Sequence, residues 1–237
     1  MRIALLTTDG LPALYCAQAL AAEYELCGVL TATSLPPLPF ETAHPLDAET
    51  EAYETANWFP QKIPELSDFG PVFSVPDMTS AAALDTVRDL APNVIVAFGA
   101  GPLSAGIIEL AKDHAVVLHA GNPEDFRGAD THLWAVYHGL TDDLQSIVQY
   151  ADENPNTGAI LRALPVHLAD GTPLAGLRKA VTEGCVTGAL KVMQFFADGG
   201  MLTVNHLQRI GKLYTPMPAA VKDYCLAQYA DRASQTK

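Results

Sequence analysis

The sequence predicts an α/β protein with a mostly parallel sheet and helices on both faces. Short apolar runs, typical of strands that are buried on both faces, alternate with longer segments of helical pattern. The chain also opens in strand–helix–strand order, with strands expected at residues 2–6 and 26–30 and an Ala-rich helix ending near residue 23. Because a helix that connects two such strands returns the chain in the same direction, this opening predicts a parallel pair.

The remaining elements are expected from the same patterns. Asp9 is placed to cap the first helix, and Pro12 suits its first turn. Residues 31–70 are repeatedly interrupted by proline and predict a long ordered excursion. Strands are expected at 72–75, 94–98, 116–119, 146–150 and 159–168, and helices at 80–91, 104–112, 131–138 and 174–198.

Charge limits the classes of partner. Asp and Glu number 27 against 14 Lys and Arg, which gives a net charge of −13, and no run of basic residues is present. Nucleic-acid binding is therefore not expected, since it needs a concentrated basic patch. The acidity favours solubility and, as an alternative, selection for a cationic or amine-bearing partner.

The apolar runs and cysteines indicate a compartment. No apolar run approaches the ~18 residues of a membrane span, so no membrane association is expected. The first ten residues carry one basic residue before a short apolar run, which predicts a strand and not a signal peptide. None of the four cysteines forms a CxxC pair, and buried free thiols in the cytoplasm are expected.

The stretch VVLHAGNPEDFRGAD draws attention to one histidine. It places His119 at the end of an apolar, strand-type run, where open α/β sheets put their chemistry. The alternative for a single histidine here is a structural bond to the backbone. The glycines at 99, 101 and 106 lack the dinucleotide-binding spacing. No metal site is expected, because the seven histidines show no metal-ligand grouping.

Around His119 the sequence resembles the folate-dependent formyltransferases, which act on methionyl-tRNA, glycinamide ribonucleotide or sugar nucleotides. His119 matches the histidine of that family, and Phe126-Arg127-Gly128 match its aromatic-Arg-Gly motif at the same spacing. Asn156-Thr157-Gly158 falls where the family has Asp-Thr-Gly, and the resemblance extends over about residues 1–195. It implies a Rossmann-like formyltransferase domain over residues 1–198 and a short C-terminal extension over 199–237.

The resemblance also implies a reaction, in which an amine attacks the formyl carbon of 10-formyltetrahydrofolate. In the family, a histidine and an asparagine stabilise the oxyanion, and an aspartate orients the histidine. Here Val117 stands at the asparagine position and Asn156 at the aspartate position. The candidate catalytic set is therefore His119 and Asn156, with Asn122 as a substitute donor and Asp130 as a substitute carboxylate. His132, two residues after Asp130, could also face the pocket.

The folate is implied to lie mainly against the backbone of two loops. The residues expected there are Phe98, Gly99, Ala100 and Gly101 in one loop, and Asp152, Glu153 and Asn154 in the other. The chain is too short for the tRNA-binding barrel of some relatives, so the implied partner is a small-molecule amine, and a homodimer stays open. Three functions remain: formyl transfer, altered chemistry on the same scaffold, or ligand binding without catalysis.

Overall fold

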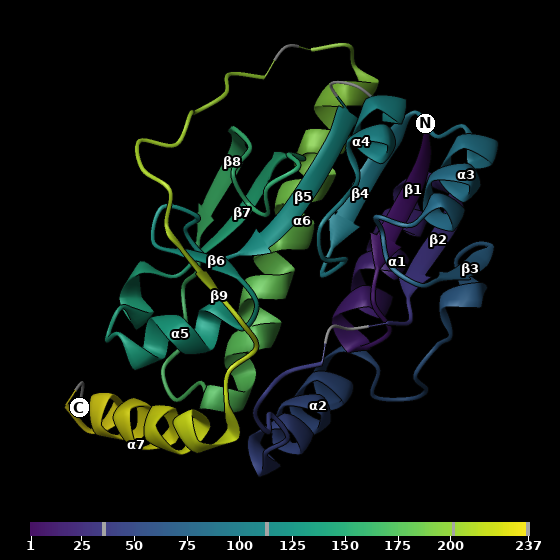
Figure 1. Cartoon of the computed structure of the whole chain (residues 1–237). Coiled ribbons are helices and arrows are strands. Elements are labelled where there is room, and N and C mark those ends of the chain that lie inside the picture. Colours follow the sequence, from purple (N-terminus) through teal and green to yellow (C-terminus); the bar gives the residue numbers. More distant parts are fainter. Residues whose placement is uncertain (35–36, 112–113, 201, 236–237) are drawn as a thin grey trace.

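The protein is described by a computed structural model, which covers residues 1–34, 37–111, 114–200 and 202–235. These residues form one seven-stranded sheet with the strand order β3-β2-β1-β4-β5-β7-β8 (Figure 1). The first five strands of this order pair in parallel and the last two in antiparallel fashion, which confirms the predicted mostly parallel sheet. The strands are β1 (Arg2–Thr7), β2 (Glu25–Ala32), β3 (Val72–Val75), β4 (Val94–Phe98), β5 (Ala115–Ala120), β7 (Gln145–Tyr150) and β8 (Ile160–Pro165).

Helices cover both faces of this sheet, as predicted. On one face, α1 (Leu11–Glu23) and α6 (Leu177–Ala197) pack their apolar side chains against β1, β4 and β5. On the other face, α3 (Ala81–Leu90) and α4 (Ala105–Ala111) form a second core with the same sheet. All four cysteines are buried and unpaired, as the sequence predicted.

The excursion over residues 31–70 contains a helix that the sequence patterns did not predict. This helix, α2 (Pro45–Trp58), starts at His44, whose side chain accepts a hydrogen bond from the backbone of Leu46. Its buried positions are Leu46, Thr50 and Glu54. They follow helical spacing, but two of the three are polar, so the apolar periodicity that identifies a helix is absent.

A third core joins α2 to the C-terminal part of the chain. It includes α5 (Thr131–Tyr137), the start of α6 and α7 (Ala219–Gln235). The Lys222 ammonium on α7 binds the Asp47 carboxylate on α2 at 2.7 Å and the Thr42 carbonyl oxygen at 2.7 Å. Residues after α6 therefore return across the molecule to α2 and α5 (Figure 1).

A second, two-stranded sheet pairs β6 (Phe126–Gly128) with β9 (Lys212–Tyr214) in parallel. Gly128 has φ +90°, and a Cβ there would lie 2.1 Å from the Tyr214 carbonyl oxygen. Any larger residue would push the two strands apart, so this position of the predicted aromatic-Arg-Gly motif requires glycine.

Short single turns complete the chain. They are the 3₁₀ segments η1 (Leu66–Asp68), η3 (Thr141–Asp143) and η4 (Leu174–Gly176), the last of which forms the beginning of the helix predicted from residue 174. Lys112, predicted to end the helix at 104–112, lies outside the described residues. So do residues 35–36 of the excursion and residues 201, 236 and 237 of the predicted extension. In the described part of the chain, no helix has both the length and the apolar character needed to cross a membrane.

Candidate functional site

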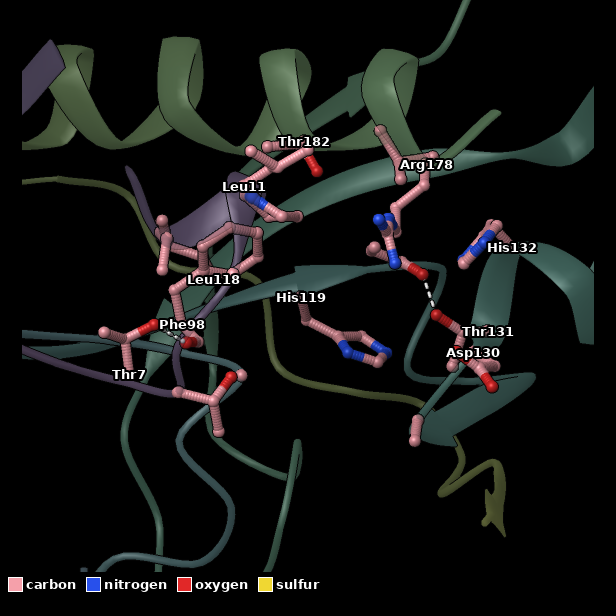
Figure 2. Close-up of a pocket in the computed structure, with 18 of the residues that line it drawn as sticks. Thr7, Leu11, Phe98, Leu118, His119, Asp130, Thr131, His132, Arg178 and Thr182 are labelled. Carbon is pink, nitrogen blue, oxygen red and sulfur yellow. Dashed lines mark hydrogen bonds between the residues drawn. The ribbon is translucent and has the colours of Figure 1, made fainter. Parts of the chain in front are cut away.

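The site lies where the strand order reverses. The chain leaves β1 towards β2 on one side, while β4 and β5 lie on the other, and open α/β sheets bind ligands in the crevice that this reversal creates. A cavity of about 370 Å³ occupies this place. It is lined by residues after β1 and β4, by the end of β5, and by the starts of α5 and α6 (Figure 2).

The turn between β1 and α1 forms one wall of this cavity. The helix starts at Gly10, and no side chain caps it. The expectation that Asp9 caps α1 is therefore wrong. The positive φ of 143° at Gly10 carries the chain from the strand into the helix, and Asp9 instead lines the cavity.

His119 reaches the cavity from the carboxyl end of β5 and is only 4% exposed. Its Nε2 lies 2.7 Å from the Phe126 carbonyl oxygen. Because a carbonyl only accepts, Nε2 carries the hydrogen of the neutral ring, and Nδ1 keeps a free lone pair. Burial lowers the pKa of His119 to about 4, although the bond to Phe126 acts in the opposite direction. The ring is therefore neutral at pH 7.

The start of α5 faces His119 across the cavity, and Figure 2 shows the His119 ring directed towards it. Asp130 stands at the N-cap with φ 49°, and its Oδ2 accepts a hydrogen bond from the Met217 backbone at 2.8 Å. The Thr131 hydroxyl donates to the Ala120 carbonyl oxygen, which anchors α5 to the end of β5. These bonds fix the position of α5 relative to His119.

His132 also lines the cavity and is 8% exposed. Neither of its ring nitrogens has a hydrogen-bond partner within the described residues. Burial lowers its pKa to about 4, against the attraction of the nearby Asp130 carboxylate. The expectation that His132 could face the pocket is consistent with this position, which supplies a second neutral imidazole.

Arg178 and Glu54 support the wall formed by α6 and α2. The guanidinium binds the carboxylate twice, with Nε–Oε1 and Nη2–Oε2 distances of 2.7 Å, and Glu54 is fully buried. Burial acts to lower the pKa of Arg178, but the hydrogen bonds and charge of Glu54 outweigh it and raise that pKa. Sequence reasoning missed both residues because α2 was not predicted.

Two predicted catalytic residues do not line this cavity. The Asn122 amide donates to Asp125 at 3.0 Å and accepts from the Glu124 backbone at 3.1 Å, so it is engaged in its own turn. Asn156, at φ 57°, accepts a hydrogen bond from the Gly128 backbone at 3.0 Å. The structure thus brings together His119 and Asp130, while catalytic roles for Asn122 and Asn156 stay predictions.

The residues predicted to bind folate are divided in the same way. Phe98 and Gly99 line the cavity, whereas Ala100 is buried and Gly101, at φ +76°, has open space where a Cβ would stand. The predicted residues of the second loop are exposed and lie outside the cavity lining: Asp152, Glu153 and Asn154.

Gln149 is a polar residue that sequence reasoning missed. It pairs with Val117 across β5 and β7, and it is fully buried. Its amide nitrogen and oxygen have no hydrogen-bond partner among the residues that the structure describes. The available signal was a glutamine inside the apolar run SIVQY. In the same described part of the chain, no three His, Cys, Asp or Glu side chains are grouped to hold a metal.

Comparisons with known proteins identify similar folds. No protein-family model matches the sequence, and no curated protein matches it either. The formyltransferase PseJ from Anoxybacillus kamchatkensis, solved with UDP-4,6-dideoxy-4-formamido-L-AltNAc and tetrahydrofolate, matches with a TM-score of 0.55. The identity is 15% over 91% of this chain and 86% of that chain.

Two further solved structures agree. A 4-N formyltransferase from Francisella tularensis matches with a TM-score of 0.60 and 14% identity over 90% of this chain and 76% of that chain. HypX from Aquifex aeolicus, solved with tetrahydrofolic acid, matches with a TM-score of 0.55 and 16% identity over 100% of this chain and 35% of that chain. At such identities the likeness establishes architecture and not chemistry. The chain therefore has the Rossmann-like fold of the folate-dependent formyltransferases.

Proposed function

We propose that this protein binds a reduced folate and transfers its one-carbon unit to the amine of a small molecule. The observation that carries the proposal is the position of His119. It stands at the carboxyl end of β5, in a cavity at the strand-order reversal. The fold is one whose solved examples include proteins bound to tetrahydrofolate.

The residues present are compatible with a reduced folate. The backbone of Phe98–Gly101 and the loop Asp152–Asn154 would hold it, as the sequence resemblance implies. The Gln149 amide supports this placement, because β7, which carries it, leads directly into the second loop and its donor and acceptor are both unused. A pterin carries several donors and acceptors that such an amide can pair with. When bound, a 10-formyl folate would supply an electrophilic formyl carbon.

His119 is suited to moving a proton. Its Nδ1 lone pair is free while Nε2 is bonded to Phe126, so the neutral ring can accept the proton that an amine nitrogen releases after it has bonded to the formyl carbon. Asp130 on the opposite wall attracts that amine in its charged form and keeps it in the cavity.

Gln149 could replace the missing asparagine donor. Residues directly opposite in an antiparallel pair share a face of the sheet, and side chains two apart on one strand share it too. Gln149 is opposite Val117, and Val117 is two residues before His119. The Gln149 side chain is therefore on the face of the sheet that carries His119, but it is fully buried outside the cavity lining, so it would have to turn towards the cavity to donate to a ligand carbonyl oxygen.

Calorimetric titration with 5-formyltetrahydrofolate, which resembles the formyl donor, tests the binding step. We expect a dissociation constant in the micromolar range, about −8 kcal/mol. The absence of binding at about 1 mM ligand would rule the proposal out. The variant His119→Ala should retain folate binding, because the predicted folate contacts come from other residues, but should lose formyl transfer.

A second candidate function is ligand binding without catalysis. The bond from the His119 ring to the Phe126 backbone favours it, since this bond satisfies a purely structural histidine. The two functions differ in one measurement. If wild-type protein binds 5-formyltetrahydrofolate but formylates no amine, and Asn156→Asp gains transfer, the chain is a binding protein that lost the family reaction. The four buried thiols are compatible with a reducing compartment, and we place either function in the cytoplasm.

A further inference from the structure

The charges around the cavity are unbalanced. Three carboxylates line it, from Asp9, Glu51 and Asp130. Arg178 is the one lysine or arginine in the described lining, and its guanidinium is already held by both oxygens of Glu54. Asp9 and Glu51 have no ion-pair partner within the described ranges of the chain. The cavity therefore presents excess negative charge to its ligand.

The wall at α1 opposes a phosphate group in particular. Helix N-termini often bind phosphate, because their backbone N–H groups are free and the helix dipole is positive there. In this protein Asp9 precedes the Gly10 N-cap, and Pro12 removes one of the N–H groups of the first turn. The carboxylate already supplies negative charge at this end of α1, so an anionic ligand would be repelled.

Several polar groups facing the cavity can only accept hydrogen bonds. The Thr7 hydroxyl donates to the Phe98 carbonyl oxygen at 2.8 Å, and the Thr131 hydroxyl donates to the Ala120 carbonyl oxygen, so their donors are used (Figure 2). His119 has its Nε2–H occupied and offers Nδ1 as an acceptor. Together with the carboxylates, these groups call for a ligand rich in N–H donors.

His132 provides an independent sign of a polar ligand. Its side chain is more than nine-tenths buried, lines the cavity and has no hydrogen-bond partner in the described part of the chain (Figure 2). The ring nitrogens are accessible, since the Gln149 amide atoms are the only side-chain nitrogen and oxygen atoms in the described residues that are both inaccessible and unpartnered, so a ligand in the cavity can reach them. An ammonium N–H donated to the free imidazole nitrogen would satisfy this ring.

From these observations we infer that the acceptor bound in this cavity is a compact aliphatic di- or polyamine without phosphate or carboxylate groups. The inference rests on the proposed one-carbon transfer. The volume of about 370 Å³ agrees with a compact acceptor, since small-molecule sites span roughly 300–1,000 Å³. One ammonium pairs with the carboxylates and anchors the molecule, and the other becomes the nucleophile.

The reaction balances without an oxidant or reductant. The reacting ammonium loses one proton to solvent, and its nitrogen forms a bond to the formyl carbon. The neutral His119 ring then takes the second proton from this nitrogen, which is more acidic once it is bonded to that carbon. The bond between the carbon and N10 of the folate breaks as His119 passes this proton to N10, and the products are the N-formyl amine and tetrahydrofolate.

Calorimetry with three probes tests the inference on the full chain. The probes are 1,4-diaminobutane, 4-aminobutanoate, which has the same length but one carboxylate, and uridine diphosphate. We expect the diamine to bind at least about tenfold more tightly than 4-aminobutanoate, a difference of about 1.4 kcal/mol, and uridine diphosphate not to bind. Equal affinity for the diamine and 4-aminobutanoate, or tight binding of uridine diphosphate, would overturn the inference.

Variants locate the effect in the cavity. Asp9→Asn should weaken diamine binding about tenfold and leave the fold intact, since the Asp9 side chain makes no hydrogen bond or ion pair in the described structure. Asp130→Asn should act similarly, because asparagine can still accept the Met217 hydrogen bond. The control Asp85→Asn changes the net charge equally on exposed α3 surface and should have no effect. If all three variants bind the diamine like wild type, the inference is wrong.

Folate titration separates the two proposals. If 5-formyltetrahydrofolate binds and the diamine does not, the acceptor inference fails alone. If the diamine binds and the folate does not, the one-carbon transfer fails and the cavity remains a cationic-amine site.

Discussion

Two buried polar side chains in this protein differ in whether they have hydrogen-bond partners. Between α2 and α6, the fully buried Glu54 carboxylate receives two hydrogen bonds from Arg178. Between β5 and β7, the fully buried Gln149 amide receives and donates none among the described residues. The first site is complete without a ligand, whereas the second is not.

This difference separates structural from functional polar groups. A buried carboxylate that receives two hydrogen bonds from its ion-pair partner holds two elements in one arrangement, and here it holds the wall of the cavity. An unsatisfied buried amide costs stability, and native proteins contain few of them. Gln149 is therefore a better candidate than Glu54 for a side chain that binds a ligand. Removal of the polar group should lower the stability of the protein at Glu54 and raise it at Gln149.

The largest effect is expected from Glu54→Gln. The change leaves the Arg178 guanidinium partly buried without its carboxylate, and breaking a buried pair in this way typically costs about 3–5 kcal/mol. Urea unfolding followed by circular dichroism should show a loss of this size. The double variant Glu54→Leu/Arg178→Met should recover most of it, because neither charge is then left unpaired. If Glu54→Gln is as stable as wild type, the ion pair does not stabilise the fold and Glu54 does not differ from Gln149 in this respect.

The next largest effect on stability is expected from the two buried histidines, His119 and His132. The pKa of His119 and that of His132 are lowered to about 4 by burial, against about 6.5 in an unfolded chain. As pH falls from 6.5 to 4, the unfolded state binds protons that the native state does not, so the free energy of unfolding decreases. At about 1.4 kcal/mol per pKa unit, His119 contributes about 3 kcal/mol, and His132 acts in the same direction.

Urea midpoints at pH 7.5 and pH 4.5 measure this loss. His132→Asn should reduce the pH dependence, since one of the two buried rings is removed. The exposed His167 is the matched control for the substitution itself, and His167→Asn should leave the urea midpoint at pH 7.5 as in wild type. An unchanged slope in His132→Asn would show that folding does not lower the pKa of this ring.

Much of the architecture was predictable because it depends on local apolar patterns. The runs at residues 2–6 and 94–98 became β1 and β4, and the Ala-rich segment ended at Glu23 as predicted. The helix α2 was not predictable in this way, since its buried stripe includes Thr50 and Glu54 and is stabilised by a partner on α6 far away in sequence.

The candidate site was predictable only in part for the same reason. A histidine at the end of an apolar strand can be located from the sequence, and His119 does line the cavity. Which neighbours face it depends on turns and on pairing between distant strands. Asn122 is turned towards Asp125, and Gln149 is placed beside Val117 by the register of β5 and β7. Neither arrangement has a signature within one segment.

The smallest change in stability is expected from Gln149→Leu, and it tests the difference between Gln149 and Glu54 most directly. Leucine removes a donor and an acceptor that have no partner in the described structure, so the protein should become more stable by about 1–2 kcal/mol. Ser146→Ala on the same strand is the control. Its hydroxyl donates to the Val181 carbonyl oxygen at 2.7 Å, so this change should cost about 1 kcal/mol.

Function should change in the opposite direction at Gln149. If the amide pairs with a bound folate, Gln149→Leu should weaken 5-formyltetrahydrofolate binding about 3–10-fold, the contribution of one or two hydrogen bonds, although the variant is more stable. Ser146→Ala should leave this affinity unchanged. A variant that gains stability and keeps full affinity would mean that the amide serves no ligand. A Gln149→Leu variant that loses stability would mean that buried water already forms hydrogen bonds with the amide. Gln149 would then be a structural polar group, like Glu54.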